Sequence, residues 1–283
     1  MKTTSCSFVC WLLTTMATAG CGEADSTFTL GGYRYATEEL SQWALPDDLR
    51  EVSGLALGPG GRLFAHGDET ALIYELDYRT GRSLKRFAVG DPPLLDDFEG
   101  ITWAGDTLFL VTSDGDLLAT EEAADGGHAP YRRYETKLGQ RCEIEGLDYD
   151  PGRRLLLMAC KTPREAALRR RIAVLAWSLE SSAPAPDYDI RSPPAADGSG
   201  KPRLHPSGLA RSPGNGNLIL PAARQRALIE LDPGGEVLRA FTLPRSRGHP
   251  QMEGIAIDEA GNLVIADEGG AQRGRLSVYP ARQ

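Results

Sequence analysis

Three glutamates stand at the first position of a short phrase that recurs five times along the chain. In each copy a Ser or Glu is followed by Gly and then by Leu or Ile, and the first residues are Ser53, Glu99, Glu145, Ser207 and Glu253. Successive first residues are separated by 46, 46, 62 and 46 positions. Repeats arranged around a common axis would bring the three carboxylates together, where they must share protons, pair with a cation or bind a metal.

Oxygen ligands of this kind suit Ca²⁺ better than zinc, which prefers His and Cys, and the chain has only four His. We therefore expect Glu99, Glu145 and Glu253 to bind Ca²⁺ in a central channel, with Ser53 and Ser207 completing the ring. The alternative is that each Glu or Ser hydrogen-bonds neighbouring backbone and holds the Gly bend. Further acids that would line the channel follow the second strands, namely Asp68, Glu69, Asp114, Asp267 and Glu268.

Basic side chains occupy the equivalent positions in the third and fourth repeats, where Lys161 and Arg224 stand. Together with His66 they could contact an anionic ligand, or they could simply form a solvated rim. His205 and His249 each lie a few residues before a repeated phrase, where they could line a channel mouth or act structurally.

The elements around each phrase predict an all-β protein. A turn rich in Gly, Pro, Asp or Asn usually follows, and then come short apolar segments such as 63–65, 155–158 and 263–265. Four strands in about 45 residues are typical of a β-propeller blade. The single longer spacing is explained by an inserted loop at 181–203, which is rich in Pro, Ser, Ala and Gly.

The last repeat has room for only three strands, and the missing one is found near the start of the chain. Residues 40–46 match residues 238–244 position by position. We therefore predict a five-bladed β-propeller, residues 28–283, closed by an N-terminal strand that completes the last blade. A six-bladed ring is the alternative, with a further blade in 22–50 or 160–206.

The first twenty residues predict an export signal, because one charge, Lys2, precedes a short apolar stretch and a small-residue end. The ending Thr18-Ala19-Gly20-Cys21 resembles the bacterial lipoprotein box, which implies acylation of Cys21, a tether at 21–27 and anchoring to the outer membrane facing the periplasm. Simple cleavage to a soluble periplasmic protein and an uncleaved anchor are the alternatives. Outside this leader region only Cys142 and Cys160 remain, either as a cross-strand disulfide or as two buried thiols.

The repeated phrase, Asp97-Phe98-Glu99-Gly100-Ile101 and Pro250-Gln251-Met252-Glu253-Gly254-Ile255-Ala256 resemble the SdiA-regulated (YjiK-like) propeller family over nearly the whole mature chain. The resemblance implies an exported five-bladed propeller with bound calcium, for which Glu99, Glu145 and Glu253 would be the ligands. Lys161 and Arg224 depart from the acidic pattern of that family.

Composition excludes one class of partner. A net charge of −8 without a Lys/Arg cluster gives no surface for a phosphate backbone, so nucleic-acid binding is not expected. The remaining functions are a membrane-tethered module that binds a protein or a small molecule, and a calcium-dependent hydrolase of phosphoesters or lactones. We favour the binding module, because no nucleophile elbow or metalloprotease motif occurs.

Overall fold

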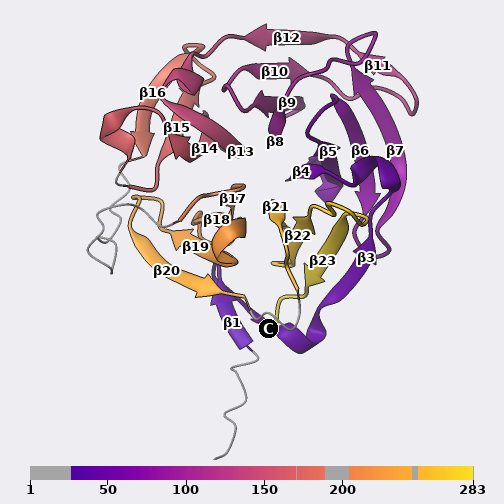
Figure 1. Cartoon of the computed structure of the whole chain (residues 1–283), viewed down its shortest axis with the longest axis vertical. Helices are drawn as coiled ribbons and strands as arrows, with labels where there is room; N and C mark the ends of the chain where they lie inside the picture. The colour runs from indigo at the N-terminus through magenta and orange to yellow at the C-terminus, as the bar shows by residue number, and fades with distance from the viewer. Residues whose placement is uncertain (1–26, 170, 189–203, 244–247, 283) are drawn as a thin grey trace, which may run out of the picture.

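The computed structural model describes residues 27–169, 171–188, 204–243 and 248–282. Within them, five antiparallel sheets stand around a central axis as a β-propeller, which confirms the predicted fold class (Figure 1). The leader and the tether lie outside the described residues, apart from Thr27. No helix in the described part of the chain is long and apolar enough to cross a membrane.

Each blade is one sheet whose first strand lies nearest the axis. From the axis outward the strands of blades 1 and 2 are β4 (Val52–Leu57), β5 (Leu63–Gly67), β6 (Leu72–Asp77) and β7 (Arg82–Val89), then β8 (Phe98–Ala104), β9 (Thr107–Thr112), β10 (Leu117–Thr120) and β12 (Tyr131–Tyr134). Those of blades 3 and 4 are β13 (Cys142–Asp150), β14 (Leu155–Pro163), β15 (Val174–Ser178) and β16 (Ala183–Tyr188), then β17 (Ala210–Arg211), β18 (Leu218–Ala222), β19 (Ala227–Leu231) and β20 (Val237–Thr242).

The last blade is completed by a strand from the other end of the chain. It contains β21 (Met252–Ile257), β22 (Leu263–Asp267), β23 (Arg275–Tyr279) and β3 (Ser41–Ala44). Strand β3 runs antiparallel to β23, with Trp43 opposite Leu276. The predicted closure of the ring by the N-terminal strand is therefore confirmed.

Three features of the fold differ from the sequence prediction. A hairpin of β1 (Thr27–Leu30) and β2 (Tyr33–Ala36) precedes the ring, and a two-residue strand, β11 (His128–Ala129), adds to β7 in parallel. The predicted loop at 181–203 is wrong at its beginning, because Ala183–Tyr188 form β16. Two prolines made this segment resemble a loop, but β16 is the outer edge strand of its sheet, where a residue without an N–H is tolerated.

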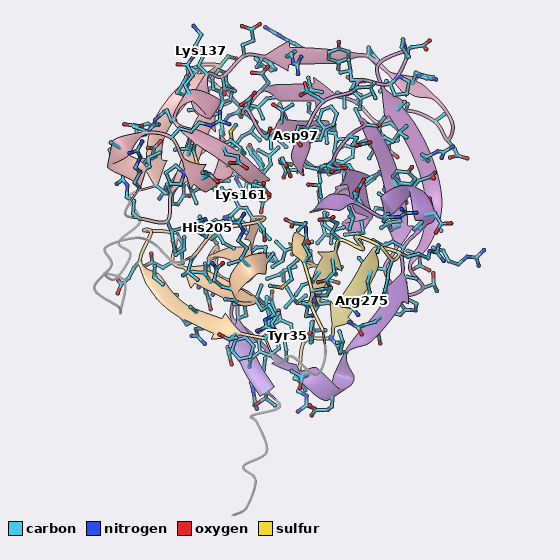
Figure 2. The ribbon with its side chains drawn as sticks, in the orientation of Figure 1. Tyr35, Asp97, Lys137, Lys161, His205 and Arg275 are labelled. Atoms are coloured by element: carbon cyan, nitrogen blue, oxygen red, sulfur yellow. A yellow bond between two sulfur atoms is a disulfide. The ribbon has the colours of Figure 1, made fainter. Side chains whose placement is uncertain are left out.

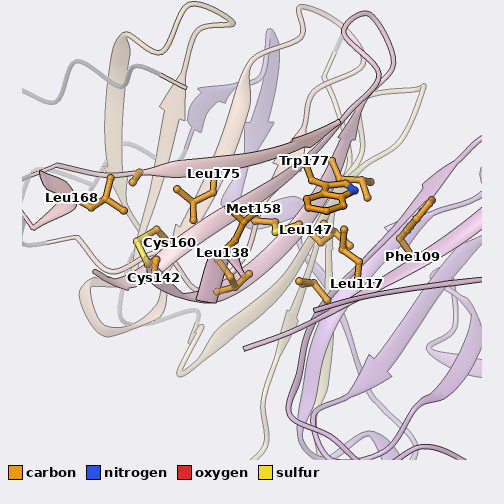
Figure 3. Close-up of a cluster of buried hydrophobic side chains, with 14 residues drawn as sticks. Phe109, Leu117, Leu138, Cys142, Leu147, Met158, Cys160, Leu168, Leu175 and Trp177 are labelled. Atoms are coloured by element: carbon orange, nitrogen blue, oxygen red, sulfur yellow. A yellow bond between two sulfur atoms is a disulfide. The ribbon is translucent and has the colours of Figure 1, made fainter. Parts of the chain in front are cut away.

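Among the described residues, the apolar core is divided into five clusters, each between two neighbouring blades. One contains Val111 and Leu117 of blade 2 against Leu147 and Met158 of blade 3 (Figure 3). Another joins blade 5 to blade 1, so the ring is closed by side-chain packing as well as by β3. Each blade buries both of its faces, which explains the nearly continuous apolar runs in the second strands.

The repeated glycine places the innermost strands of neighbouring blades in contact. A Cβ added there would come within 2.6 Å or less of the next blade at four of the five positions, a separation that real Cβ atoms do not adopt. The atoms met are Leu147 N for Gly100 (2.6 Å), Gly208 C for Gly146 (2.6 Å), Glu253 O for Gly208 (2.4 Å) and Leu55 Cγ for Gly254 (2.6 Å). Glycine is thus required by the narrow axis of a five-bladed ring.

Candidate functional site at one end of the propeller axis

The first residues of the five phrases meet at one end of the axis, as the repeat predicts. Ser53, Glu145 and Ser207 are buried, and Glu99 and Glu253 are partly buried. Ser53 Oγ donates to Glu99 Oε2 at 2.8 Å and joins blade 1 to blade 2. Ser207 Oγ donates to the carbonyl of Met252 at 2.6 Å and joins blade 4 to blade 5.

Lys161 supplies a positive charge to this end of the axis. Its ammonium forms an ion pair with Glu145 Oε1 and lies 3.9 Å from Glu143 Oε1. Figure 2 shows Lys161 next to His205 beside the central opening. We call Glu99, Glu145, Glu253 and Lys161 the axial cluster.

Burial raises the pKa values of all three axial glutamates, and repulsion by neighbouring carboxylates adds to each shift. Desolvation and the charge of Glu145 raise the pKa of Glu99 to about 9 and that of Glu253 to about 8. Desolvation raises the pKa of Glu145 to about 7, although the hydrogen bond from Lys161 opposes the shift. Burial alone would lower the pKa of Lys161, but Glu145, Glu99 and Glu253 raise it above its ordinary value. The cluster therefore has a deficit of positive charge.

The donor set has the chemistry of a calcium site, but its arrangement is that of an ion-pair cluster. Within the described ranges, no group of three or more His, Cys, Asp or Glu side chains is arranged to hold a metal ion. Three carboxylates and a serine hydroxyl are nevertheless hard oxygen donors, and Glu253 Oε2 is buried without a hydrogen-bond partner. The residues thus fit Ca²⁺ by ligand type and by charge.

The acids that follow the second strands do not form one shell around the axis. Asp68 and Glu69 line a separate cavity of about 330 Å³ together with Glu51, and Asp114 pairs with Arg164 at 2.9 Å. Asp267 is buried and accepts from His249 at 2.7 Å. Among these acids, Glu268 is the one whose charge raises the pKa of Glu253.

The three predicted anion contacts separate in the structure. Lys161 and Arg224 line one cavity of about 380 Å³ beside the axial cluster. His66 is fully buried, and burial lowers its pKa to about 4, which keeps the ring neutral. His66 therefore faces the core opposite Gly54, to which it is paired, and does not reach that cavity.

Arg226 and Gln251 also line this cavity, although neither was predicted as a site residue. Arg226 stands two residues beyond Arg224, after a 3₁₀ turn, η6 (Ala223–Gln225), that the strand pattern does not reveal. Of the two histidines left open, His205 lines the cavity. His249 is a buried structural residue, held between Asp267 and the Tyr279 hydroxyl.

Of the two alternatives for the cysteines, the structure contains the disulfide. Cys142 and Cys160 are bridged, with Cα atoms 5.7 Å apart, and both side chains are buried (Figure 3). Cys160 immediately precedes Lys161, and Cys142 lies three residues before Glu145. The bridge therefore ties together the two strands that carry the ion pair of the axial cluster.

The axis is closed in its middle and opens into a second, largely apolar cavity at the other end. The repeated glycines and the aliphatic residues after them surround a space of only about 10 Å³, about enough for one water. Beyond it, residues from all five blades line a cavity of about 590 Å³ that includes Leu57, Trp103, Tyr149 and Arg211. The two ends are thus separate compartments.

The fold and this site define a five-bladed β-propeller with a buried cluster of carboxylates and one ammonium at one end of its axis. The chain belongs to the SdiA-regulated family, whose model matches residues 26–270. The suspected family is therefore confirmed. No curated protein matches the chain.

Solved structures of low sequence identity share the fold. Glutaminyl cyclase from Myxococcus xanthus aligns with a TM-score of 0.60 and 14% identity, over 86% of this chain and 96% of that chain. The PQQ-bound aldose sugar dehydrogenase from Streptomyces coelicolor aligns with a TM-score of 0.53 and 14% identity, over 86% and 98%. A luciferin-regenerating enzyme aligns with a TM-score of 0.53 and 8% identity, over 85% and 95%. These similarities concern the fold alone.

Proposed function

We propose that this propeller is an exported binding module that holds Ca²⁺ at its axial cluster and presents a ligand site beside it. The observation that carries the proposal is the charge deficit of the cluster: one buried and two partly buried carboxyl groups share one ammonium, and one oxygen of Glu253 has no partner. Glu99, Glu145 and Glu253 would hold the ion. When bound, Ca²⁺ would supply the positive charge that lets all three remain ionised.

Lys161 is central to this proposal because its ammonium already neutralises part of the negative charge of the three glutamates. Its ammonium bonds Glu145 and interacts electrostatically with Glu99 and Glu253. A divalent ion would have to compete with this charge for the same oxygens. We therefore expect weak to moderate calcium affinity in the natural chain and tighter binding when the lysine charge is removed.

Export and acylation of Cys21 are part of the proposal and would orient the molecule. Thr27 is six residues beyond Cys21, a distance of about 20 Å at most. The β1–β2 hairpin packs on turns that follow the innermost strands, with Ser212 Oγ donating to the carbonyl of Gly31 at 2.6 Å and the Tyr35 hydroxyl donating to that of Gly261 at 2.8 Å. A lipid at Cys21 would therefore direct the axial cluster away from the membrane.

Calcium titration of the purified chain by isothermal calorimetry tests the metal. We expect one Ca²⁺ per molecule, loss of the signal in Glu253→Gln, and about tenfold tighter binding in Lys161→Met. Lys85→Met is the matched control, because Lys85 also pairs with a carboxylate, Glu122, but on the outer strand of blade 1. No heat from either the natural chain or Lys161→Met would overturn the calcium proposal.

The calcium-dependent hydrolase is the alternative function, and it predicts turnover. Phosphomonoesters and lactones incubated with the protein, with and without Ca²⁺, should remain intact if the propeller is a binding module. We favour binding because the one basic side chain inside the cluster, Lys161, is already paired with Glu145. Calcium-dependent product release that is lost in Glu99→Gln would replace the binding module by the hydrolase.

A further inference from the structure

The cavity beside the axial cluster is lined by several basic side chains and one carboxyl group. It measures about 380 Å³, within the range of small-molecule sites. Its lining includes Arg224 and Arg226, which follow β18, and Glu253 at the axis. His205 and Lys161 also line it, with the His205 Nδ1 3.3 Å from the Lys161 carbonyl.

The charges of the two arginine side chains are not paired with any residue that the structure describes. Neither Arg224 nor Arg226 forms a side-chain hydrogen bond or ion pair with a described residue, whereas Lys161 is committed to Glu145. A guanidinium binds phosphate and carboxylate groups through two parallel hydrogen bonds, so two of them beside one cavity form a receptor for an anionic group.

The backbone around Arg226 is fixed in an uncommon conformation. Arg226 has a φ of 50°, in the left-handed region that is unfavourable for a residue with a Cβ. Its carbonyl accepts from Leu243 N at 2.9 Å, and its N–H donates to Ala223 at 3.0 Å. Because of this turn, Arg224 and Arg226 both line the same cavity.

The carboxyl group of Glu253 also lines this cavity. Its Oε2 is buried and has no hydrogen-bond partner. A ligand hydroxyl could form a hydrogen bond with this carboxyl group, whereas an anion without hydroxyl groups would leave it unpaired. A ligand that satisfies both the arginines and Glu253 therefore carries an anionic group and hydroxyl groups.

We propose that this cavity binds a small polyhydroxylated anion, the class of sugar phosphates and sugar acids, with its anionic group on Arg224 and Arg226 and a hydroxyl on Glu253. This inference deepens the proposed binding function, because it names the ligand class of the same face. It rests on the arginines and not on Ca²⁺, so the two can fail separately.

Binding is measured by calorimetry with glucose 6-phosphate, gluconate, glucose and inorganic phosphate as probes. We expect glucose 6-phosphate or gluconate to bind with a dissociation constant below about 1 mM, and glucose and phosphate at least tenfold more weakly. Whichever of glucose 6-phosphate and gluconate binds more tightly shows whether the site prefers a phosphate or a carboxylate group. Absence of binding by both at 10 mM, about 10 times that limit, or equal binding of glucose, would overturn the proposal.

Variants locate the site. Arg224→Met and Arg226→Asn should each weaken binding of the better probe about tenfold; Asn is chosen because it tolerates a positive φ. Arg132→Met is the matched control, since it removes one exposed arginine from the outer strand of blade 2, and we expect less than a twofold effect. Unchanged affinity in Arg224→Met, an exposed position whose loss does not threaten folding, would contradict the assignment.

Calcium titration of the Arg224→Met chain distinguishes the two proposals. Retained Ca²⁺ binding with lost anion binding supports both. If the natural chain binds the anion but no Ca²⁺, the anion site is retained and the calcium site is overturned. Ca²⁺ binding with no anion binding in the natural chain overturns the anion site alone.

Discussion

The two ends of the propeller axis are built from the same five phrases and differ in everything that could bind a ligand. At one end the phrases begin with Ser53, Glu99, Glu145, Ser207 and Glu253, beside Lys161. At the other end, two to six residues later, they surround a cavity of about 590 Å³ whose lining is largely apolar but includes Asp148, Arg211, Asp258 and Glu259. The positions between them are glycines and buried aliphatic residues that close the axis. The repeat therefore makes the scaffold uniform, while the side chains at each end of the axis set its chemistry.

The largest effect on stability is expected from substitution of a glycine in the closed middle of the axis, between the two ends. Gly208→Ala would place a Cβ 2.4 Å from the carbonyl oxygen of Glu253, which is backbone and cannot rotate away. We expect a loss of about 3 kcal/mol or more in the free energy of unfolding, or failure to fold, measured by chemical denaturation. Gly152→Ala is the control, because its Cβ would meet only Asp150 Oδ1 at 3.4 Å. Equal stability of the two variants would contradict the role assigned to close blade contact.

The disulfide strengthens the charged end specifically. Replacing Cys142 and Cys160 by Ala should lower the free energy of unfolding by about 3 kcal/mol, because the bridge closes a loop of 18 residues. Urea denaturation with and without a reductant measures it. The natural chain should lose stability on reduction and the double variant should not. A reductant effect of the same size on both chains would show that the stabilisation comes from elsewhere.

The carboxyl groups at the charged end of the axis should make the stability of the protein depend on pH. Glu99 and Glu253 have folded-state pKa values raised to about 9 and about 8, so the folded chain binds more protons than the unfolded one above about pH 5. Without Ca²⁺, stability should therefore fall as pH rises from about 5 to 9. The charges facing these groups are Glu145, Lys161, Asp97 and Glu268.

Glu99→Gln should reduce this slope and stabilise the metal-free chain at pH 9 by about 1–2 kcal/mol, since the glutamine has no proton to lose. Thermal melts from pH 5 to 9 provide the measurement. Glu135→Gln is the control, because Glu135 is an exposed carboxylate on the rim. A natural chain that becomes more stable with rising pH would contradict the assigned shifts.

Much of the charged end could be predicted from the sequence, because a repeat of fixed spacing puts equivalent residues at equivalent heights. Glu99, Glu145 and Glu253 were identified in this way. The hairpin made a bridge between Cys142 and Cys160 one of two alternatives, and the structure contains it. The acids after the second strands could not be placed, because strand ends diverge from the axis and each acid finds its own partner, such as Arg164 for Asp114. Arg226 could not be found, since its direction depends on a left-handed turn.

The sequence alone determined the order of the repeats, the closing strand and the ring of residues at the head of each innermost strand, and it favoured five blades over six. These follow from spacing and local pattern, which are properties of the chain itself. Tertiary structure decided that Lys161 pairs with Glu145, that His66 is buried and that the axis is closed. These outcomes depend on burial and on distances between blades, which determine the pKa of each carboxyl and the partner of each charge, and no spacing along a chain encodes them.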